Sequence, residues 1–248
     1  MKSMLFKHRS IRKFRSISIS EEVLCEVLEA AARASTCGNM QLYSLVVTRD
    51  EELRRQLAPC HFNQPMVVEA PCVVTVCADI HRFTMWCNQR DAQPAYDNFA
   101  WFLNAATDAL LAAQNLCVEA ELHGLGICYL GTTLYTAKQI VDVLELPKGV
   151  IPLTTIVMGY PAEEPELSDR LPLNGVVHYE KYADYTTSEI DELWAEREVS
   201  ELTKELLREN KLPNLAQVFT QNRYRKEDNL AISKSYFELL KEQGFFNN

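Results

Sequence analysis

The stretch from Tyr96 to about His123 constrains the fold most, because its apolar residues fall on almost every side of a helical wheel. A helix that is apolar all round belongs inside a structure, so we expect it near the middle of this one. Gly124 follows directly and is a typical helix terminator. The rest of the chain must therefore pack around one long central helix.

Shorter helices and strands alternate with this helix along the chain. Strands are predicted over 42–48, 72–78, 125–131 and 153–160. Helices are predicted from Glu21 to about Ala34, after an N-cap or capping box in Ser18–Glu21, from an Asp50 cap to Leu57, and over 136–146. The strand over 72–78 is apolar throughout, which predicts a central place in a sheet. This alternation indicates an α+β fold.

Two regions fit no clear pattern or lie beyond this core. Residues 81–95 are polar and irregular, which is typical of a disordered segment or of a functional lid. Beyond Pro161 an irregular segment is predicted, followed by a charged helix over about 188–208 and a last helix over about 229–243. A tail of this kind often wraps a partner subunit. The sequence has no repeat or linker. It therefore predicts one domain over 1–248, with a core over about 1–180 and a helical extension over about 181–248.

Charge and cysteine content narrow the class of protein. The formal net charge of −9 disfavours a nucleic-acid binder, which would need a basic face. No run of about 18 apolar residues is present to span a membrane, and no apolar segment follows the N-terminal cations as in a signal peptide. We therefore expect a cytoplasmic protein without a membrane partner. Eight cysteines without a C-x-x-C pair predict reduced, mostly buried thiols rather than disulfides or a zinc site.

The N-terminal arm is the local exception to this acidic balance. The first fifteen residues carry six Lys and Arg residues, Lys2 among them, and no Asp or Glu. Charge alone would favour a solvated surface run. Arg9 and Arg12, with Ser10 between them, can however present forked donors and a hydroxyl to one phosphate. Ile11 and Phe14 are apolar anchors, so we expect the arm to be docked.

The familiar catalytic and nucleotide-binding motifs are absent. The sequence contains no G-x-G-x-x-G, P-loop, H-E-x-x-H or G-x-S-x-G motif, and its five histidines show no i, i+4 pairing. A phosphate-binding arm without an evident catalytic side chain indicates that a cofactor carries the reaction.

The arm, His8 to Phe14, resembles the opening H-R-S-I-R-x-F of the FMN-dependent nitroreductase family, especially its NADPH nitroreductase and flavin reductase branch. The resemblance spans roughly residues 5–180 in order, and the tail matches only loosely. Four further segments carry it: the Ser35–Gln41 loop (S-x-x-N-x-Q), Gln114–Leu116 with Gly124–Gly126 (Q-N-L…G-L-G), Tyr129–Gly131, and Asp169–Pro172 (K-P-R-x-P).

This resemblance implies a three-layer sandwich, in which helices flank a central, mostly antiparallel sheet. It also implies a homodimer with FMN at each interface, and a C-terminal extension that wraps the partner. The implied activity is the transfer of two electrons, as hydride, from NADPH or NADH to flat aromatic acceptors (nitroaromatics, quinones or flavins) by a ping-pong mechanism. A flavin-fragmenting or dehalogenating relative is one alternative. The other is a non-enzymatic protein, either a flavin-binding regulator or an acidic scaffold that docks a partner through its arm.

The resemblance also implies which residues meet FMN. The phosphate and ribityl end would be held by His8, Arg9, Ser10 and Arg12, with Arg170 from the late loop. The polar edge of the flavin or its ribityl chain would meet Asn39, Gln41 and Gln64. One face of the ring would be lined by Tyr129, Leu130 and Gly131, with a backbone N–H near Gly131 facing N5, the hydride acceptor. The resemblance implies no catalytic side chain and no metal.

The sequence departs from the family pattern in the late motif and in the pocket wall. Ser168 stands where the branch usually has lysine, and Lys7 or Lys13 is the candidate replacement. Leu42 and Tyr43 replace the common Pro-Trp pair. The resemblance further implies that Arg223, Arg225 and Lys226 contact the 2′-phosphate of NADPH, with a solvated loop as the alternative. The lid over the ring would be the 81–95 segment or the Arg223–Lys226 loop.

Overall fold

The computed structural model describes residues 3–246, so Lys2 lies outside the described residues. The chain divides into two compact units. Unit 1 consists of residues up to Glu166 together with those from Lys234 onward, and unit 2 consists of Leu167–Ser233. The single-domain organisation stays a prediction. No helix within residues 3–246 is long and apolar enough to cross a membrane.

Unit 1 is built on a four-stranded sheet with the order β1-β2-β4-β3, in which all neighbouring strands are antiparallel. The strands are β1 (Tyr43–Thr48), β2 (Cys72–Asp79), β3 (Gly126–Leu130) and β4 (Val150–Gly159). The predicted central strand is confirmed, since β2 is buried along its whole length. β4 begins three residues earlier than predicted, because β2 continues to pair with it through Pro152 after a register shift between Val76 and Cys77.

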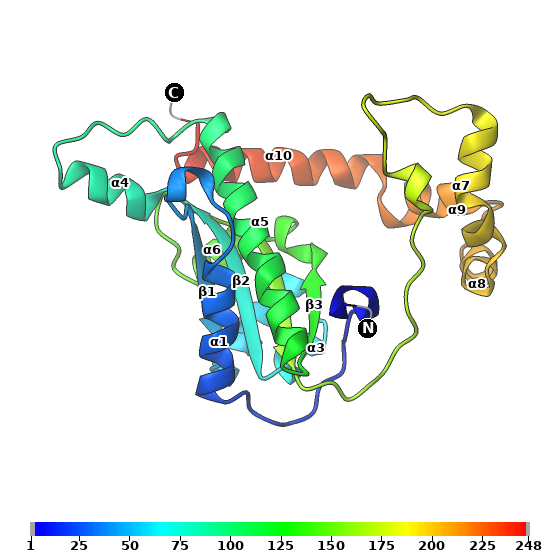
Figure 1. Cartoon of the computed structure of the whole chain (residues 1–248), viewed down its shortest axis with the longest axis horizontal. Helices are drawn as coiled ribbons and strands as arrows, with labels where there is room; N and C mark the ends of the chain where they lie inside the picture. Colours follow the sequence, from blue (N-terminus) through cyan, green and yellow to red (C-terminus); the bar gives the residue numbers. More distant parts are fainter. Residues whose placement is uncertain (1–2, 247–248) are drawn as a thin grey trace. The chain divides into compact units, whose positions relative to one another are not determined.

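One face of the sheet is covered by α1 (Glu21–Ala32) and α5 (Phe99–Leu122), which lie side by side (Figure 1). The predicted N-cap is confirmed for α1, where the Ser20 hydroxyl accepts the Val23 N–H at 3.2 Å. The side of α5 that meets the sheet consists mainly of small residues such as alanine. Several of its large residues are about half exposed, among them Leu103 and Leu110. The prediction that α5 is buried on all sides is therefore wrong for a single copy of the chain.

The other face of the sheet is covered by α2 (Glu51–Leu57), α3 (Met66–Glu69) and α6 (Ala137–Val143), with the short 3-10 turn η3 (Ala58–His61). Their apolar side chains form a second core cluster with β2, β3 and β4. Asp50 caps α2 as predicted, since its carboxylate accepts the Leu53 N–H at 2.8 Å. Helices thus flank both faces, which confirms the predicted three-layer α+β architecture.

The predicted irregular segment 81–95 begins instead with a helix, α4 (His81–Asn88). The Asp79 carboxylate accepts the Arg82 N–H at 3.2 Å and so satisfies a free donor in the first turn. Cys87 is buried, and the Phe83 ring contacts Trp86 and Tyr96. A short helix with only a few buried side chains leaves a weak periodic pattern, which explains the incorrect prediction.

The chain returns to unit 1 in the second part of α10 (Lys226–Glu242). Leu239, Leu240 and Phe245 join a third core cluster at the end of the sheet where β4 begins. The Gln243 amide donates to the carbonyl oxygens of Pro147 (3.1 Å) and Val150 (2.6 Å). The C-terminal residues therefore complete the core of unit 1.

Unit 2 is helical and contains η5 (Leu173–Gly175), α7 (Thr187–Val199), α8 (Glu201–Asn210), α9 (Leu215–Val218) and η6 (Phe219–Arg223), and α10 begins in it. The single helix predicted over about 188–208 is wrong. Ser200 is extended, with φ −63° and ψ 151°, and its hydroxyl caps α8 by accepting the Thr203 N–H at 3.2 Å. A new N-cap inside a charged helical pattern thus ends α7 and starts α8.

Candidate functional site

The N-terminal arm is docked against the edge of the sheet, as predicted. The Ile11 N–H donates to the Ile127 carbonyl at 2.9 Å, and the Arg15 N–H donates to Tyr160 at 2.8 Å. Gly126 permits this crossing, because a Cβ there would lie 2.5 Å from the Ile11 side chain. The side chain of Ile11 is buried. The arm is therefore fixed by hydrogen bonds and by both predicted apolar anchors, Ile11 and Phe14, the latter packed against the second core cluster.

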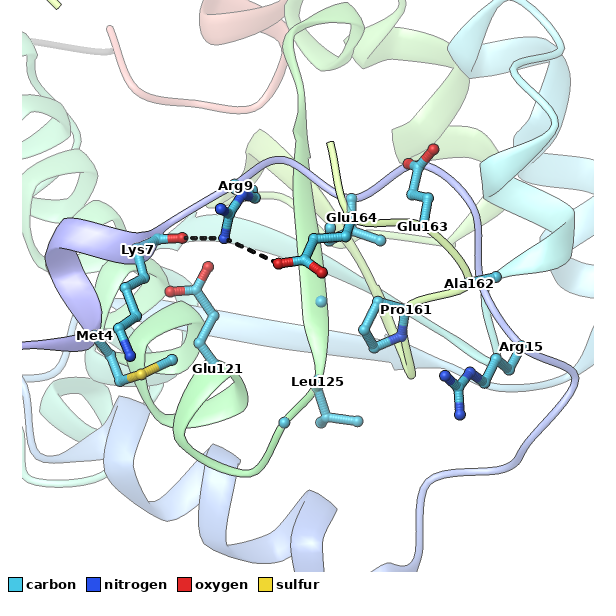
Figure 2. Close-up of a pocket in the computed structure, with 13 residues that line it drawn as sticks. Met4, Lys7, Arg9, Arg15, Glu121, Leu125, Pro161, Ala162, Glu163 and Glu164 are labelled. Carbon is cyan, nitrogen blue, oxygen red and sulfur yellow. Dashed lines mark hydrogen bonds and ion pairs between the residues drawn. The ribbon is translucent and has the colours of Figure 1, made fainter. Parts of the chain in front are cut away.

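The side chains of the docked arm reach different surroundings. Arg9, Ile11 and Arg15 line a cavity of about 490 Å³ (Figure 2). The backbone of Ser10 pairs with Ile127, the residue before Cys128 on β3, and Cys128 belongs to the second core cluster. Burial raises the pKa of the Cys128 thiol, and the Arg12 guanidinium and a hydrogen bond from Ser10 oppose that rise. Arg9 thus lines the cavity, whereas the side chains of Ser10 and Arg12 act on the Cys128 thiol.

Several carboxylates of the protein form ion pairs or hydrogen bonds with the arm. Arg9 Nη1 lies 3.9 Å from Glu164 Oε1, and Figure 2 shows the two side chains pointing toward each other. His8 Nδ1 lies 2.5 Å from Oε1 of Glu121, a largely buried residue of α5. Glu163 accepts the N–H groups of Arg12 and Lys13 at 2.6 and 3.0 Å. Within residues 3–246 the Arg12 guanidinium itself makes no ion pair, which leaves it available to an anion.

Two neighbouring turns bring Gln64 and Gly131 into one region. Gly131 opens η4 (Gly131–Leu134) directly after β3, is exposed, and has open space where a Cβ would point. His61 Nδ1 lies 2.9 Å from the Thr132 hydroxyl, which joins η3 to η4. Gln64 follows η3 by three residues and is half-buried. The first N–H groups of a helical turn have no partner within that turn, so those of the Gly131 turn must bind groups outside it.

His61 is wholly buried beside this turn. Burial lowers its pKa from 6.5 to about 4, so the imidazole is neutral at pH 7. Its Nε2 has no hydrogen-bond partner in the described part of the chain. Because an isolated histidine carries no sequence signal, His61 was not among the predicted site residues.

Tyr129 and Leu130 point to opposite faces of β3. Tyr129 is half-buried, packs against the first core cluster and lies beside Cys117. Burial raises the pKa of its phenol, which therefore keeps its proton at pH 7. Leu130 is buried in the second cluster. Of these predicted residues, Gly131 is the exposed one.

The loop before β1 brings Asn39 and Gln41 together. The Gln41 amide donates to the backbone and side-chain oxygens of Asn39, both at 2.6 Å. Asp108, from the middle of α5 and 2% exposed, accepts the Cys37 N–H at 2.8 Å and the Leu42 N–H at 3.2 Å. Asp108 was not among the predicted site residues, although an acidic residue within an otherwise apolar stretch of helix was a usable signal.

The model of the nitroreductase family matches residues 5–160. The chain belongs to the nitroreductase family. It is 33% identical over 180 residues to FMN reductase (NADPH) of Bacillus subtilis strain 168, covering 72% of each chain.

Solved structures extend the likeness to almost the whole nitroreductase chain. A Bacteroides fragilis NCTC 9343 protein named as an oxidoreductase has 50% identity and a TM-score of 0.97, over 98% of this chain and 99% of that one. The NfrA1 nitroreductase of B. subtilis has 27% identity and a TM-score of 0.86, over 98% of each chain. The predicted family and its fold are thereby confirmed.

The remaining predicted residues of this nitroreductase lie in unit 2. Arg170 is exposed and donates to the Asp169 carbonyl at 2.8 Å. The Arg223 guanidinium lies 5.9 Å from the centre of the Phe219 ring, Arg225 pairs with Asp228 at 2.8 Å, and exposed Lys226 begins α10. Their roles toward the flavin phosphate and the 2′-phosphate of NADPH stay predictions.

Proposed function

We propose that the chain is an FMN-dependent oxidoreductase that passes hydride from NADPH or NADH to nitroaromatics, quinones or flavins. The observation that carries this proposal is the docked arm, whose Arg12 guanidinium makes no ion pair within residues 3–246, in a chain 33% identical to an FMN reductase (NADPH). A hydroxyl and a free guanidinium suit a terminal phosphate.

The residues present fit FMN at both ends of the molecule. Ser10 and Arg12 would bind the phosphate, while Gln64, Asn39 and Gln41 offer amides to the polar edge of the ring. The open space at Gly131 lets backbone approach a flat ligand closely. We extend the proposal to Arg170 as a second phosphate cation and to Arg223, Arg225 and Lys226 at the NADPH 2′-phosphate.

FMN, when bound, accepts and returns the hydride at N5. The chain's own residues would bind and orient the flat donor and acceptor and keep the site neutral. Tyr129 keeps its phenol proton and His61 is uncharged at pH 7, for the reasons given above. Positioning of the reactants in this way lowers the activation barrier by several kcal/mol on its own.

A homodimer is part of the proposal. The α5 helix leaves large apolar side chains about half exposed, including Phe99, Leu103 and Leu110. Water contact with so many apolar residues on one helix is unfavourable, and burial against a second copy would remove it. We also propose a cytoplasmic location, where eight unbridged thiols stay reduced.

The purified protein is expected to be yellow, and acid is expected to release FMN rather than FAD, because the arm suits a terminal monophosphate. Anaerobic NADPH or NADH should bleach the flavin, and a panel of nitroaromatics, quinones and free flavins should reoxidise it. Release of FAD would contradict the phosphate assignment. A bound flavin that neither donor reduces would indicate a flavin binder instead of a reductase.

Initial-rate plots at several fixed acceptor concentrations are expected to give parallel lines. Donor and acceptor would occupy the same position over the ring in turn, which produces a ping-pong pattern. Light scattering on the same sample should report a dimer. Intersecting lines, or an active monomer, would rule out the shared-site cycle.

A further inference from the structure

The loop that carries Asn39 and Gln41 has a strained backbone. Gly38, Asn39 and Gln41 have φ angles of 55°, 56° and 50°. Residues other than glycine rarely adopt this left-handed backbone conformation, and they keep it only where the surrounding structure holds them there. Two strained non-glycine residues within three positions therefore require strong restraints.

The first restraint comes from inside the core. Asp108 accepts the N–H groups of Cys37 and Leu42, which lie on either side of the strained residues. One buried carboxylate thus fixes both ends of the loop, and the Asn39–Gln41 side-chain contact fills the space between them.

The second restraint comes from α4, the helix that replaces the predicted lid. The Arg82 guanidinium donates to the Gln41 carbonyl through Nη2 and to the Tyr43 carbonyl through Nη1, the latter at 3.3 Å. Asp79 holds the arginine in turn: its Oδ2 lies 3.8 Å from Arg82 Nη1 and accepts the Ser44 hydroxyl at 2.5 Å. The planar fork of an arginine can reach two carbonyls and a carboxylate at once, which a lysine cannot do.

We propose that Arg82 is a positioning residue for the flavin site, because it holds the Asn39–Gln41 loop in its strained conformation. This inference rests on the proposed function, in which Asn39 and Gln41 meet the flavin. It assigns α4 the role of a fixed support for that loop. Neither the family resemblance nor the sequence patterns indicated this residue.

The test compares Arg82→Ala and Arg82→Lys with Arg90→Ala. Arg90 is a matched control, because it is exposed on the same segment and its guanidinium donates to the neighbouring Gln89 carbonyl. Arg82→Ala is expected to weaken FMN binding about tenfold, measured by flavin fluorescence, and to shift the absorption spectrum of bound flavin. Arg82→Lys should restore part of the affinity, and Arg90→Ala should match the wild type.

Hydrogen exchange on the flavin-free protein separates this inference from the proposed function. Amides over residues 37–43 should exchange about tenfold faster in Arg82→Ala than in the wild type or in Arg90→Ala. Unchanged exchange would overturn the role of Arg82, whether or not the protein binds FMN. Faster exchange with wild-type FMN affinity would overturn it as well, because the loop would then not serve the flavin. A wild-type protein that binds no flavin would contradict the proposed function itself.

Discussion

Arg12→Ala is expected to weaken FMN binding by about ten- to a hundredfold, whereas Arg9→Ala should change it by less than about threefold. A charge-assisted contact contributes about 1.5–3 kcal/mol, which corresponds to the larger effect. The Arg12 guanidinium makes no ion pair in the described part of the chain. Arg9 faces the cavity of Figure 2 and the Glu164 carboxylate.

Titration of the flavin-free variants with FMN measures both affinities, and circular dichroism checks that they fold. Arg170→Ala should resemble Arg12→Ala if the late loop supplies a second phosphate cation. Equal losses in Arg9→Ala and Arg12→Ala would contradict the separation of the two sides of the arm. Full flavin occupancy of both Arg12→Ala and Arg170→Ala in dilute solution would mean that the arm does not bind phosphate.

Acid is expected to destabilise the protein through His61 by about 3 kcal/mol between pH 7 and pH 4. The folded pKa of about 4 lies below the value of 6.5 for an unperturbed histidine, so the unfolded chain binds the extra proton between these values. Stability from this group is therefore complete above about pH 6.5 and is lost as the pH falls toward 4. Each pKa unit corresponds to about 1.4 kcal/mol.

Denaturant unfolding of the wild type and of His61→Gln at several pH values checks this effect. The variant keeps a hydrogen-bonding side chain near Thr132 but cannot take up the proton, so its stability should depend less on pH across the window. His81→Gln is the control, because His81 is only half-buried. Identical pH profiles for the wild type and His61→Gln would contradict the assignment.

The sequence predicted the docked arm correctly, and the shared phosphate site of Arg9 and Arg12 stays a prediction. Three-residue spacing suggested that Arg9 and Arg12 meet one phosphate. In an extended segment, however, residues three apart point to opposite sides. Only the hydrogen bonds of the arm to β3 and to Tyr160 establish that it is extended. A spacing argument therefore needs the backbone conformation before it can assign partners.

Strong periodic patterns and caps were predictable, whereas restraints between distant segments were not. The strand β2 and the caps at Ser20 and Asp50 depend on neighbouring residues, so the sequence alone was sufficient. Asp108 and Arg82 act on a loop 40 or more residues away in the chain. Nothing local distinguishes Arg82 from an ordinary surface residue, and the apolar surroundings of Asp108 indicate burial without indicating its partners, which is why the supports of the loop were missed.

The return of the chain to unit 1 links the order of synthesis to the order of folding. Phe245 is fully buried with Leu42 and Ile151, and Gln243 binds the backbone at the start of β4. A ribosome adding about 5–20 residues per second makes all of Leu167–Ser233 before it reaches these residues. This end of the core therefore stays open to water for several seconds on the nascent chain, during which the helices of unit 2 can already form.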